Sequence, residues 1–452
     1  MAFSHQQLLT HPSGLKNHLQ AASWVVAVSG GLDSMCLLHS IAQLSQHCPC
    51  PPLRVLHVNH DLHLKSDQWQ QEVEAQCLRY GVTCISQKVH LCPIMQREQG
   101  LEAAARSARY SVFEQQLQAG DVLLLGQHAD DQTETLFLRL LRGAGVSGLR
   151  AMPWQRTLGL GLLVRPLLNL SQAHLYDYAS KYQLTWCEDP SNQNTHFDRN
   201  YLRHKVMPSL RSRWPALDQR VATTAAVMAD TQILLDEMAS YDLAFLAKNE
   251  QVIQCLPLKN LKALSRARRH NLLRYWFDQN HVPILDYAAM QRLDKDFLYS
   301  EVDAQPYLKL GDWCLRRHQG HLHLMPTPKK QSSVLEPRVC LIQSQMLLSG
   351  SIALTDGFLC SQKNQSIGML LAPGDVLKQC FRVGGERFKP SGRKHSQSLK
   401  KLLQEAKVPA WERDHLPLFY VNGELAMVAD LWVVSGFETE VGTPAWCWQK
   451  AT

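Results

Sequence analysis

The sequence predicts an α/β protein in which a Rossmann-like, doubly wound parallel sheet is followed by an α-helical domain and a small α+β C-terminal domain. Three observations favour this fold class. Strand-like and helix-like segments alternate over the first two hundred residues, as in parallel sheets covered by helices on both faces. From about Trp214 apolar residues recur at helical spacing, and after Pro373 short strands surround one basic helix near residues 397–405. We therefore expect domains at residues 1–215, 216–330 and 373–452, with a linker at 331–372.

The elements of the first domain follow from apolar runs and from capping residues. Strands are expected at residues 24–28, 53–58, 82–89 and 121–126, and helices at 33–46, 67–80, 101–118 and 131–142. Gly81 and Gly120 stand where C-terminal helix caps belong. Further helices are expected at 217–246 and 256–277. Because parallel sheets bind ligands at the carboxyl ends of their strands, we expect the functional site there.

A glycine-containing turn directly follows the first expected strand. Its residues are Ser29, Gly30, Gly31, Leu32, Asp33 and Ser34. Two glycines let a ligand approach the backbone, and the free N–H groups of the following helix favour a phosphate. The turn is neither a Walker A loop nor a dinucleotide fingerprint. An ordinary strand–turn–helix joint is the alternative, but the position between strand and helix favours nucleotide binding.

Two more clusters lie at the same expected edge of the sheet. His57 and Val58 end the second strand, and Gly126 ends the fourth. After Gly126 come three acids on one helix start: Asp130, Asp131 and Glu134. Such acids can simply cap a helix. Three of them beside a histidine also suit either Mg²⁺ or an ammonium group.

Two pairs of arginines recur at helical spacing. Arg106 and Arg109 lie one turn apart and can clamp phosphates, although a Glu102–Arg106 pair on a solvated face gives the same pattern. Arg199 and Arg203 follow the turn sequence Glu-Asp-Pro-Ser-Asn at residues 188–192.

Composition narrows the class of protein. With 452 residues, 45% of them hydrophobic and 19% charged, the chain is long enough for several globular domains. Its first twenty residues lack a secretory signal, and no apolar run reaches the length of a membrane span. The 13 cysteines form no C-x-x-C pair, which predicts reduced thiols and a cytoplasmic protein. The oligomeric state stays open, a homodimer included.

The glycine turn resembles the loop of the ATP pyrophosphatase (PP-loop) superfamily. With it, in order, stand HVNH, EAAARSARY, GQHADDQTET, RGAG, RPLL and EDPSN…DRNYLR. Together these motifs resemble the bacterial tRNA(Ile)-lysidine synthetase family, densely over about residues 20–210. The segment GERFKPSGRKHSQSLKKLLQEAKVPAWERDHLPL is similar to the C-terminal domain of that family.

The resemblance implies ligation of free L-lysine to carbon-2 of the wobble cytidine in a tRNA(Ile) with a CAU anticodon, which changes codon recognition from AUG to AUA. It implies ATP, Mg²⁺ and an adenylated cytidine intermediate. Residues 29–34, His57, Val58 and Gly126 would hold ATP, and Asp33 and Asp130 the metal. The expected catalytic residues are Asp33, Arg109, Asp130, Asp131, Glu134 and Arg203, with Asp131 and Glu134 gripping lysine.

Clustered basic residues predict contacts to RNA along the chain. The candidates are Arg199, Arg266, Arg269, Arg393, Lys394 and Lys400. Three alternatives to lysidine formation remain: a PP-loop tRNA thiolase acting on an anticodon base, an amide-forming synthetase, and a nucleotide-sensing RNA binder without catalysis. A thiolase usually needs the paired cysteines that this sequence lacks.

Overall fold

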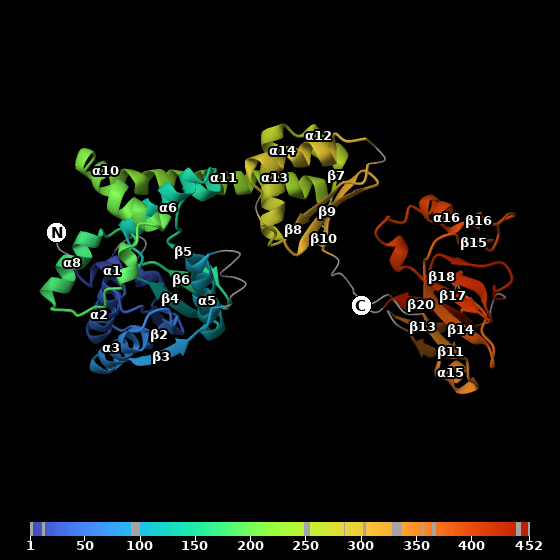
Figure 1. Ribbon diagram of the computed structural model, residues 1–452, viewed down its shortest axis with the longest axis horizontal. Helices are drawn as coiled ribbons and strands as arrows, with labels where there is room; N and C mark the ends of the chain where they lie inside the picture. The colour runs from blue at the N-terminus through green and yellow to red at the C-terminus, as the bar shows by residue number, and fades with distance from the viewer. Residues whose placement is uncertain are drawn as a thin grey trace. The chain divides into compact units, whose positions relative to one another are not determined.

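The computed structural model describes residues 3–10, 14–91, 100–247, 254–283, 285–301, 304–327, 337–354, 357–363, 368–439 and 444–450. The chain forms two compact units, Met1–Ser240 and Tyr241–Thr452, and each is described by itself (Figure 1). Within the described ranges, no helix has the length and apolar character needed to cross a membrane.

The first unit is built on a six-stranded sheet in the order β3-β2-β1-β4-β6-β5. Its strands are β1 (Ser23–Ala27), β2 (Leu53–Asn59), β3 (Thr83–Lys88), β4 (Asp121–Leu125), β5 (Gln155–Leu158) and β6 (Gly161–Val164). All neighbours pair in parallel except β5, which runs antiparallel to β6 at the edge. The predicted parallel sheet is therefore confirmed, and the β5–β6 hairpin is an addition that the sequence analysis missed.

Alternation along the strands divides the hydrophobic core into two layers. Trp24 and Val26 of β1 pack into a core with helices on one face, whereas Val25 packs into a core on the other face. Strand β4 repeats the pattern, with Leu124 on the first face and Leu123 on the second. Side chains of a strand point alternately to its two faces, so a sheet covered on both faces needs apolar residues at consecutive positions.

Helices cover both faces of the sheet (Figure 1). Buried side chains of α2 (Leu32–His47), α3 (Ser66–Arg79) and α8 (Gln172–Lys181) belong to the first core, and those of α5 (Leu101–Gln116) to the second. The helix α6 (Ala129–Leu141) follows β4. The unit also contains α1 (Gln7–Thr10), η1 (Leu15–His18), α7 (Val146–Leu149), η2 (Pro190–Gln193), α9 (Asp198–Tyr201), η3 (Leu202–Val206) and α10 (Met207–Arg213).

The order of the strands in the sheet reverses its direction at β1, which is the topological switch point of the fold. The chain runs from β1 outward through β2 to β3 and then returns to β4 on the other side of β1. Loops that leave β1 and β4 therefore diverge and open a crevice at their carboxyl ends. Residues 29–34 and Gly126 lie there, as expected.

The long helix α11 (Leu217–Ala247) matches the helix expected at 217–246. The following region contains more than helices. Strands β7 (Cys255–Pro257), β8 (Tyr307–Leu310), β9 (Trp313–His318) and β10 (His321–Pro326) form an antiparallel sheet in the order β7-β10-β9-β8. Helices α12 (Leu258–Ala263), α13 (Arg266–Gln279), α14 (Tyr287–Leu293) and η4 (Asp294–Leu298) accompany it.

The expectation of one helix over 256–277 was wrong. Its first residues form β7, and the helix is then interrupted before α13, where the Ser265 side chain accepts a hydrogen bond from the Arg268 N–H at 3.4 Å as an N-cap. The strands β8 to β10 were missed because each has only four to six residues. They are joined by turns in which Gly311 and Gly320 have positive φ.

The C-terminal region is rich in strands. One sheet has the order β11-β14-β17-β18-β19 and a second the order β12-β13-β20, while β15 pairs with β16. The strands are β11 (Arg338–Leu341), β12 (Ser351–Ala353), β13 (Gly357–Lys363), β14 (Val376–Phe381), β15 (Arg387–Phe388), β16 (Gln397–Ser398), β17 (Pro417–Val421), β18 (Glu424–Val428), β19 (Trp432–Val433) and β20 (Pro444–Lys450). The helices are α15 (Ser344–Ser349), η5 (Arg413–His415) and the expected basic helix α16 (Leu399–Glu405).

The linker expected at 331–372 needs correction. Residues from 337 onward contribute β11, α15, β12 and β13, and Ile342, Ile352, Leu359 and Met369 are buried in the C-terminal core. Residues 331–336 lie outside the described ranges. The polar composition misled the prediction because β11 is an edge strand with mostly exposed side chains, so few of its residues must be apolar.

Candidate active site

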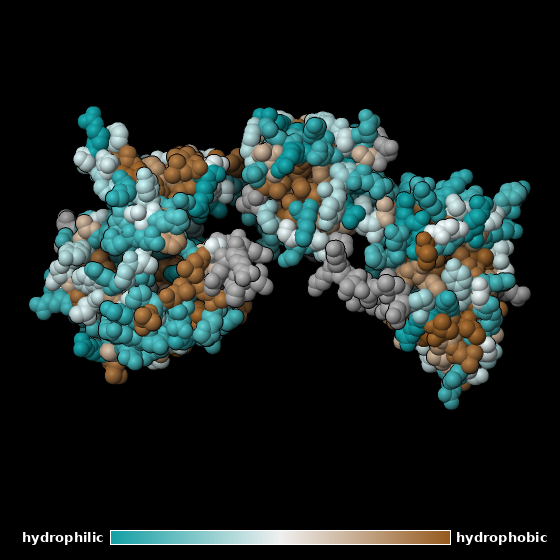
Figure 2. Space-filling view, in the orientation of Figure 1, coloured by the Kyte–Doolittle hydropathy of each residue, from teal (hydrophilic) through white to brown (hydrophobic). Residues whose placement is uncertain are grey.

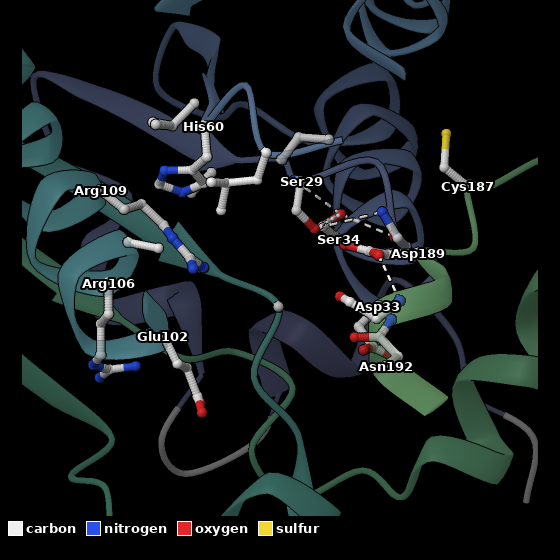
Figure 3. Close-up of a pocket in the computed structure, with 18 of the residues that line it drawn as sticks. Ser29, Asp33, Ser34, His60, Glu102, Arg106, Arg109, Cys187, Asp189 and Asn192 are labelled. Atoms are coloured by element: carbon white, nitrogen blue, oxygen red, sulfur yellow. Dashed lines mark hydrogen bonds between the residues drawn. The ribbon is translucent and has the colours of Figure 1, made fainter. Parts of the chain in front are cut away.

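A cavity of about 660 Å³ opens at the carboxyl ends of β1, β2 and β4. Its walls come from the glycine turn, the loop after β2, the first half of α5, the start of α6 and the segment between Cys187 and Arg203 (Figure 3). The three clusters expected to meet at this edge therefore do so.

The glycine turn is held in a defined shape by its serines. The Ser34 hydroxyl accepts a hydrogen bond from the Ser29 N–H at 3.2 Å and donates one to the Gly31 carbonyl at 2.9 Å. Gly30 has a φ of +89°, where a side chain is strained, and a Cβ there would lie 3.4 Å from Cγ2 of Val73. The turn thus presents the N-terminus of α2, which begins at Leu32, to the cavity.

Gly126 is required for close packing rather than for a turn. A Cβ at this position would lie 3.0 Å from the Asp33 carbonyl oxygen and 3.1 Å from the Ser34 nitrogen. The end of β4 therefore touches the first turn of α2 directly. His57 and Val58 also line the cavity, and the buried His57 ring is fixed by its Nδ1, which lies 2.8 Å from the Val28 carbonyl.

A buried histidine connects two of the acids. Nε2 of His128 lies 3.5 Å from Asp33 and 3.6 Å from Asp131, while Nδ1 accepts the Asp130 N–H at 3.2 Å and so caps α6. Burial alone would lower the pKa of His128, but the carboxylates of Asp131, Asp33 and Asp130 outweigh burial and raise it. Nε2 is therefore the ring nitrogen that faces the carboxylates of Asp33 and Asp131.

Asp131 and Glu134 face two arginines. Asp131 lies 2.7 Å from Arg199 and 3.2 Å from Arg203, and Glu134 lies 2.8 Å from Arg199 and 2.6 Å from Arg203. We call these four residues the arginine–carboxylate cluster. Burial raises the pKa of Asp131, but His128 and the two arginines lower it overall. Both carboxylates therefore form ion pairs with the two arginines. Arg199, which was expected to contact RNA, forms ion pairs with Asp131 and Glu134 in the structure.

Asp130, expected to bind the metal, has partners outside the cavity. Its carboxylate lies 3.1 Å from Arg211 and accepts the Gln172 N–H at 3.3 Å, and it is absent from the wall of the cavity. Consecutive residues of a helix point about 100° apart, so the side chains of Asp130 and Asp131 leave α6 in different directions. Asp131 lines the cavity together with Asp33, whereas the role of Asp130 in metal binding stays a prediction.

The opposite wall carries groups without partners. Arg109 has no ion pair or hydrogen bond with any residue that the structure describes, whereas Arg106 donates to the Tyr110 hydroxyl at 3.2 Å. Neither ring nitrogen of the neighbouring His60 has a hydrogen-bond partner in the described part of the chain. This wall therefore has the positive charge and the free donors that suit an anionic ligand.

Sequence reasoning missed two contributors to the site. His128 was considered only as part of a motif, although it stands two residues before Asp130 and is the N-cap of α6. The Cys187 N–H donates to the Gly30 carbonyl at 2.9 Å and so ties the segment before Asp189 to the glycine turn. The turn-forming sequence after Cys187 gave a signal for the loop but none for this contact.

The expected RNA-binding residues outside the cavity have different environments. Arg266, Lys394 and Lys400 are exposed, and Figure 2 shows a mostly hydrophilic surface around α16. Arg393 pairs with Glu405 at 2.7 Å. Arg269 needs correction because it is buried and donates to Asp294 at 2.8 Å and 3.0 Å.

Comparison with known proteins identifies relatives that span nearly the whole chain. The model of a PP-loop domain matches residues 4–210, that of a TilS substrate binding domain residues 256–323, and that of a TilS substrate C-terminal domain residues 377–449. The tRNA(Ile)-lysidine synthase of Coxiella burnetii is 36% identical over 97% of this chain and 94% of its own length. Those of Pseudomonas putida and Serratia proteamaculans are 40% and 37% identical and cover 91% and 98% of this chain and 93% and 98% of their own lengths.

These matches confirm the PP-loop class of the first domain and hence its use of ATP. They also confirm the resemblance read from the motifs, and they do not favour the thiolase alternative.

Proposed function

This chain belongs to the tRNA(Ile)-lysidine synthase family, and from that membership we propose that it attaches lysine to carbon-2 of the wobble cytidine of tRNA(Ile). In the first step the carbonyl oxygen at carbon-2 bonds to the α-phosphorus of ATP, and pyrophosphate leaves. In the second step the lysine ε-nitrogen bonds to carbon-2 and loses a proton, and AMP leaves with the oxygen. Adenylation is needed because a carbonyl oxygen is otherwise a poor leaving group.

One observation carries this proposal: the glycine turn lines the same cavity as Arg109 and His60 on the opposite wall. Neither of these two side chains has a hydrogen-bond partner among the described residues. Backbone N–H groups at the start of α2 bind the pyrophosphate part of ATP. Gly126, His57 and Val58 border the remainder of the nucleotide.

Asp33 suits Mg²⁺. Its Oδ1 is buried without a hydrogen-bond partner among the described residues, and Mg²⁺ prefers carboxylate and phosphate oxygens. No group of three or more His, Cys, Asp and Glu side chains within the described ranges can hold a metal by itself. A magnesium ion beside Asp33 would therefore take most of its other ligands from phosphate oxygens and water. Bound beside Asp33, Mg²⁺ would neutralise charge on the phosphates.

Asp131 and Glu134 bind the lysine ammonium in this proposal, although both contact arginines in the structure. An ammonium can reach them only when a guanidinium turns away, and the phosphate of the adenylated cytidine is the anion that would attract Arg203. Lysine is then expected to bind weakly until the adenylate has formed, which would order the two steps.

The experiment is to incubate the full chain with ATP, labelled lysine and a transcript of tRNA(Ile) with a CAU anticodon. We expect label in the RNA and one AMP and one pyrophosphate for each lysine incorporated. A transcript with a different wobble base is the control and should remain unlabelled. Mass analysis of the modified nucleoside separates addition of lysine from addition of sulfur. Consumption of ATP without transfer of lysine to RNA would contradict the proposal.

A further inference from the structure

His60 is a half-buried imidazole whose two ring nitrogens are buried without a hydrogen-bond partner in the described part of the chain. It lies directly after β2, lines the cavity, and has neither Nδ1 nor Nε2 in a hydrogen bond with a described residue. The histidines His57 and His63 of the same strand and loop differ from it. His57 lies 2.8 Å from the Val28 carbonyl, and His63 accepts the Lys65 N–H and stacks on Trp69. A buried polar group without a partner is costly, so such a group in a cavity indicates a site for a ligand.

The Arg109 guanidinium lies on the same side of the cavity. Figure 3 shows His60 and Arg109 together, across the open space from Ser29, Asp33 and Ser34. Burial, the charge of Arg109 and His57 lower the pKa of His60 to about 4. The ring is therefore neutral near pH 7 and offers one N–H donor beside a permanent cation.

We propose that His60 and Arg109 together bind the adenylyl phosphate, the phosphate that remains on the cytidine after pyrophosphate has left. This assignment rests on the proposed function. An anion between the two side chains accepts the His60 N–H and neutralises the guanidinium, which satisfies both groups at once. The glycine turn, on the other side, holds the pyrophosphate. The cavity thus has two phosphate sites, one for each product of the first step.

The pair makes and breaks no covalent bond. During adenylation the bond from the α-phosphorus to the pyrophosphate oxygen breaks while the bond to the cytidine oxygen forms, and the contacts from His60 and Arg109 remain. During lysine transfer the bond between carbon-2 and oxygen breaks, and the same contacts stabilise AMP as the leaving group. His60 acts as a hydrogen-bond donor in both steps.

The test measures binding of two products to the full chain by calorimetry, with AMP and pyrophosphate as separate probes. His60→Ala should weaken AMP binding about tenfold or more, because one hydrogen bond to a charged group is lost, and should leave pyrophosphate binding unchanged. His60→Gln keeps an N–H donor of similar reach and should restore most of the affinity. His63→Ala is the matched control from the same loop and should bind AMP like the unmodified chain.

Three results would overturn the assignment. AMP binding unchanged in His60→Ala would show that the ring does not touch the phosphate. An equal loss of AMP and pyrophosphate binding would indicate general damage to the cavity. Weaker binding of an anticodon stem-loop without nucleotide, with AMP unaffected, would assign the side chain to an RNA phosphate instead. Lysine incorporation by the unmodified chain tests the proposed function separately, so failure of one is distinguishable from failure of the other.

Discussion

Removal of Glu134 tests whether the arginine–carboxylate cluster holds the first domain together. The side chain is 2% exposed and accepts three hydrogen bonds, one from Arg199 and two from Arg203, at 2.6–2.9 Å. In Glu134→Ala both guanidinium groups share Asp131 alone. They are 25% and 28% exposed, so water can reach them only in part.

The cost follows from this geometry. Breaking a buried ion pair by removing one partner typically costs about 3–5 kcal/mol, and the partial exposure of the arginines favours the lower end, about 3 kcal/mol. For a domain of this size each kcal/mol lowers the melting temperature by about 2–4 °C. We therefore expect the transition of the first domain to fall by about 6–12 °C in scanning calorimetry.

Glu405→Ala provides the matched control. Glu405 forms a single contact with Arg393, and both side chains are 38% exposed. Exposed pairs contribute about 1 kcal/mol or less, so this variant should change stability little. A shift below about 2 °C for Glu134→Ala, or equal shifts for the two variants, would refute the view that the cluster is a buried structural element.

Three further predictions follow from single residues. Gly30→Ala should abolish ATP binding in a calorimetric titration, because it strains a turn at the cavity; Gly81→Ala has a similar positive φ with open space around it and should bind ATP normally. The free energy of unfolding of the first domain, measured with urea, should fall as the pH drops from 6.5 towards 4. In this range His60 becomes protonated in the unfolded chain but stays neutral in the folded protein, because folding lowers its pKa to about 4. The fall should be smaller in His60→Gln. Arg269→Ala should destabilise its domain by about 3–5 kcal/mol, because it leaves the Asp294 carboxylate without its arginine partner. Arg266→Ala should change the stability by no more than about 0.5 kcal/mol, because this side chain is exposed. In a filter-binding assay this variant should reduce the slope of log K against log salt concentration for tRNA by about one.

The parallel sheet was predictable because its determinants are local. Consecutive apolar residues such as Val25 and Val26 indicate a strand covered on both faces, and the glycine turn marks its carboxyl end. The antiparallel sheet of the middle region was not predictable in the same way. Its strands are short and alternate only a few apolar residues, and the hairpin turns at Gly311 and Gly320 do not distinguish a sheet from loops between helices.

The partner of each basic residue was the feature that the sequence predicted least well. Arg266 and Arg269 look equivalent in the sequence, three positions apart in a basic segment. Arg269 is buried because Asp294, twenty-five residues later, folds back against it. Contacts over such separations depend on tertiary packing, which a pattern of charges does not encode.

The spacing of the four residues of the arginine–carboxylate cluster could have predicted their pairing. Asp131 and Glu134 are three residues apart and share one face of α6, and Arg199 and Arg203 are four apart on a second helical segment. Two acids on one helix face and two bases on another form a complementary pair. In the mechanism proposed above, lysine competes with these two guanidinium groups for the same carboxylates, and it binds only after a stronger anion has drawn an arginine away. Lysine binding that is equally tight with and without the adenylated tRNA would contradict that order.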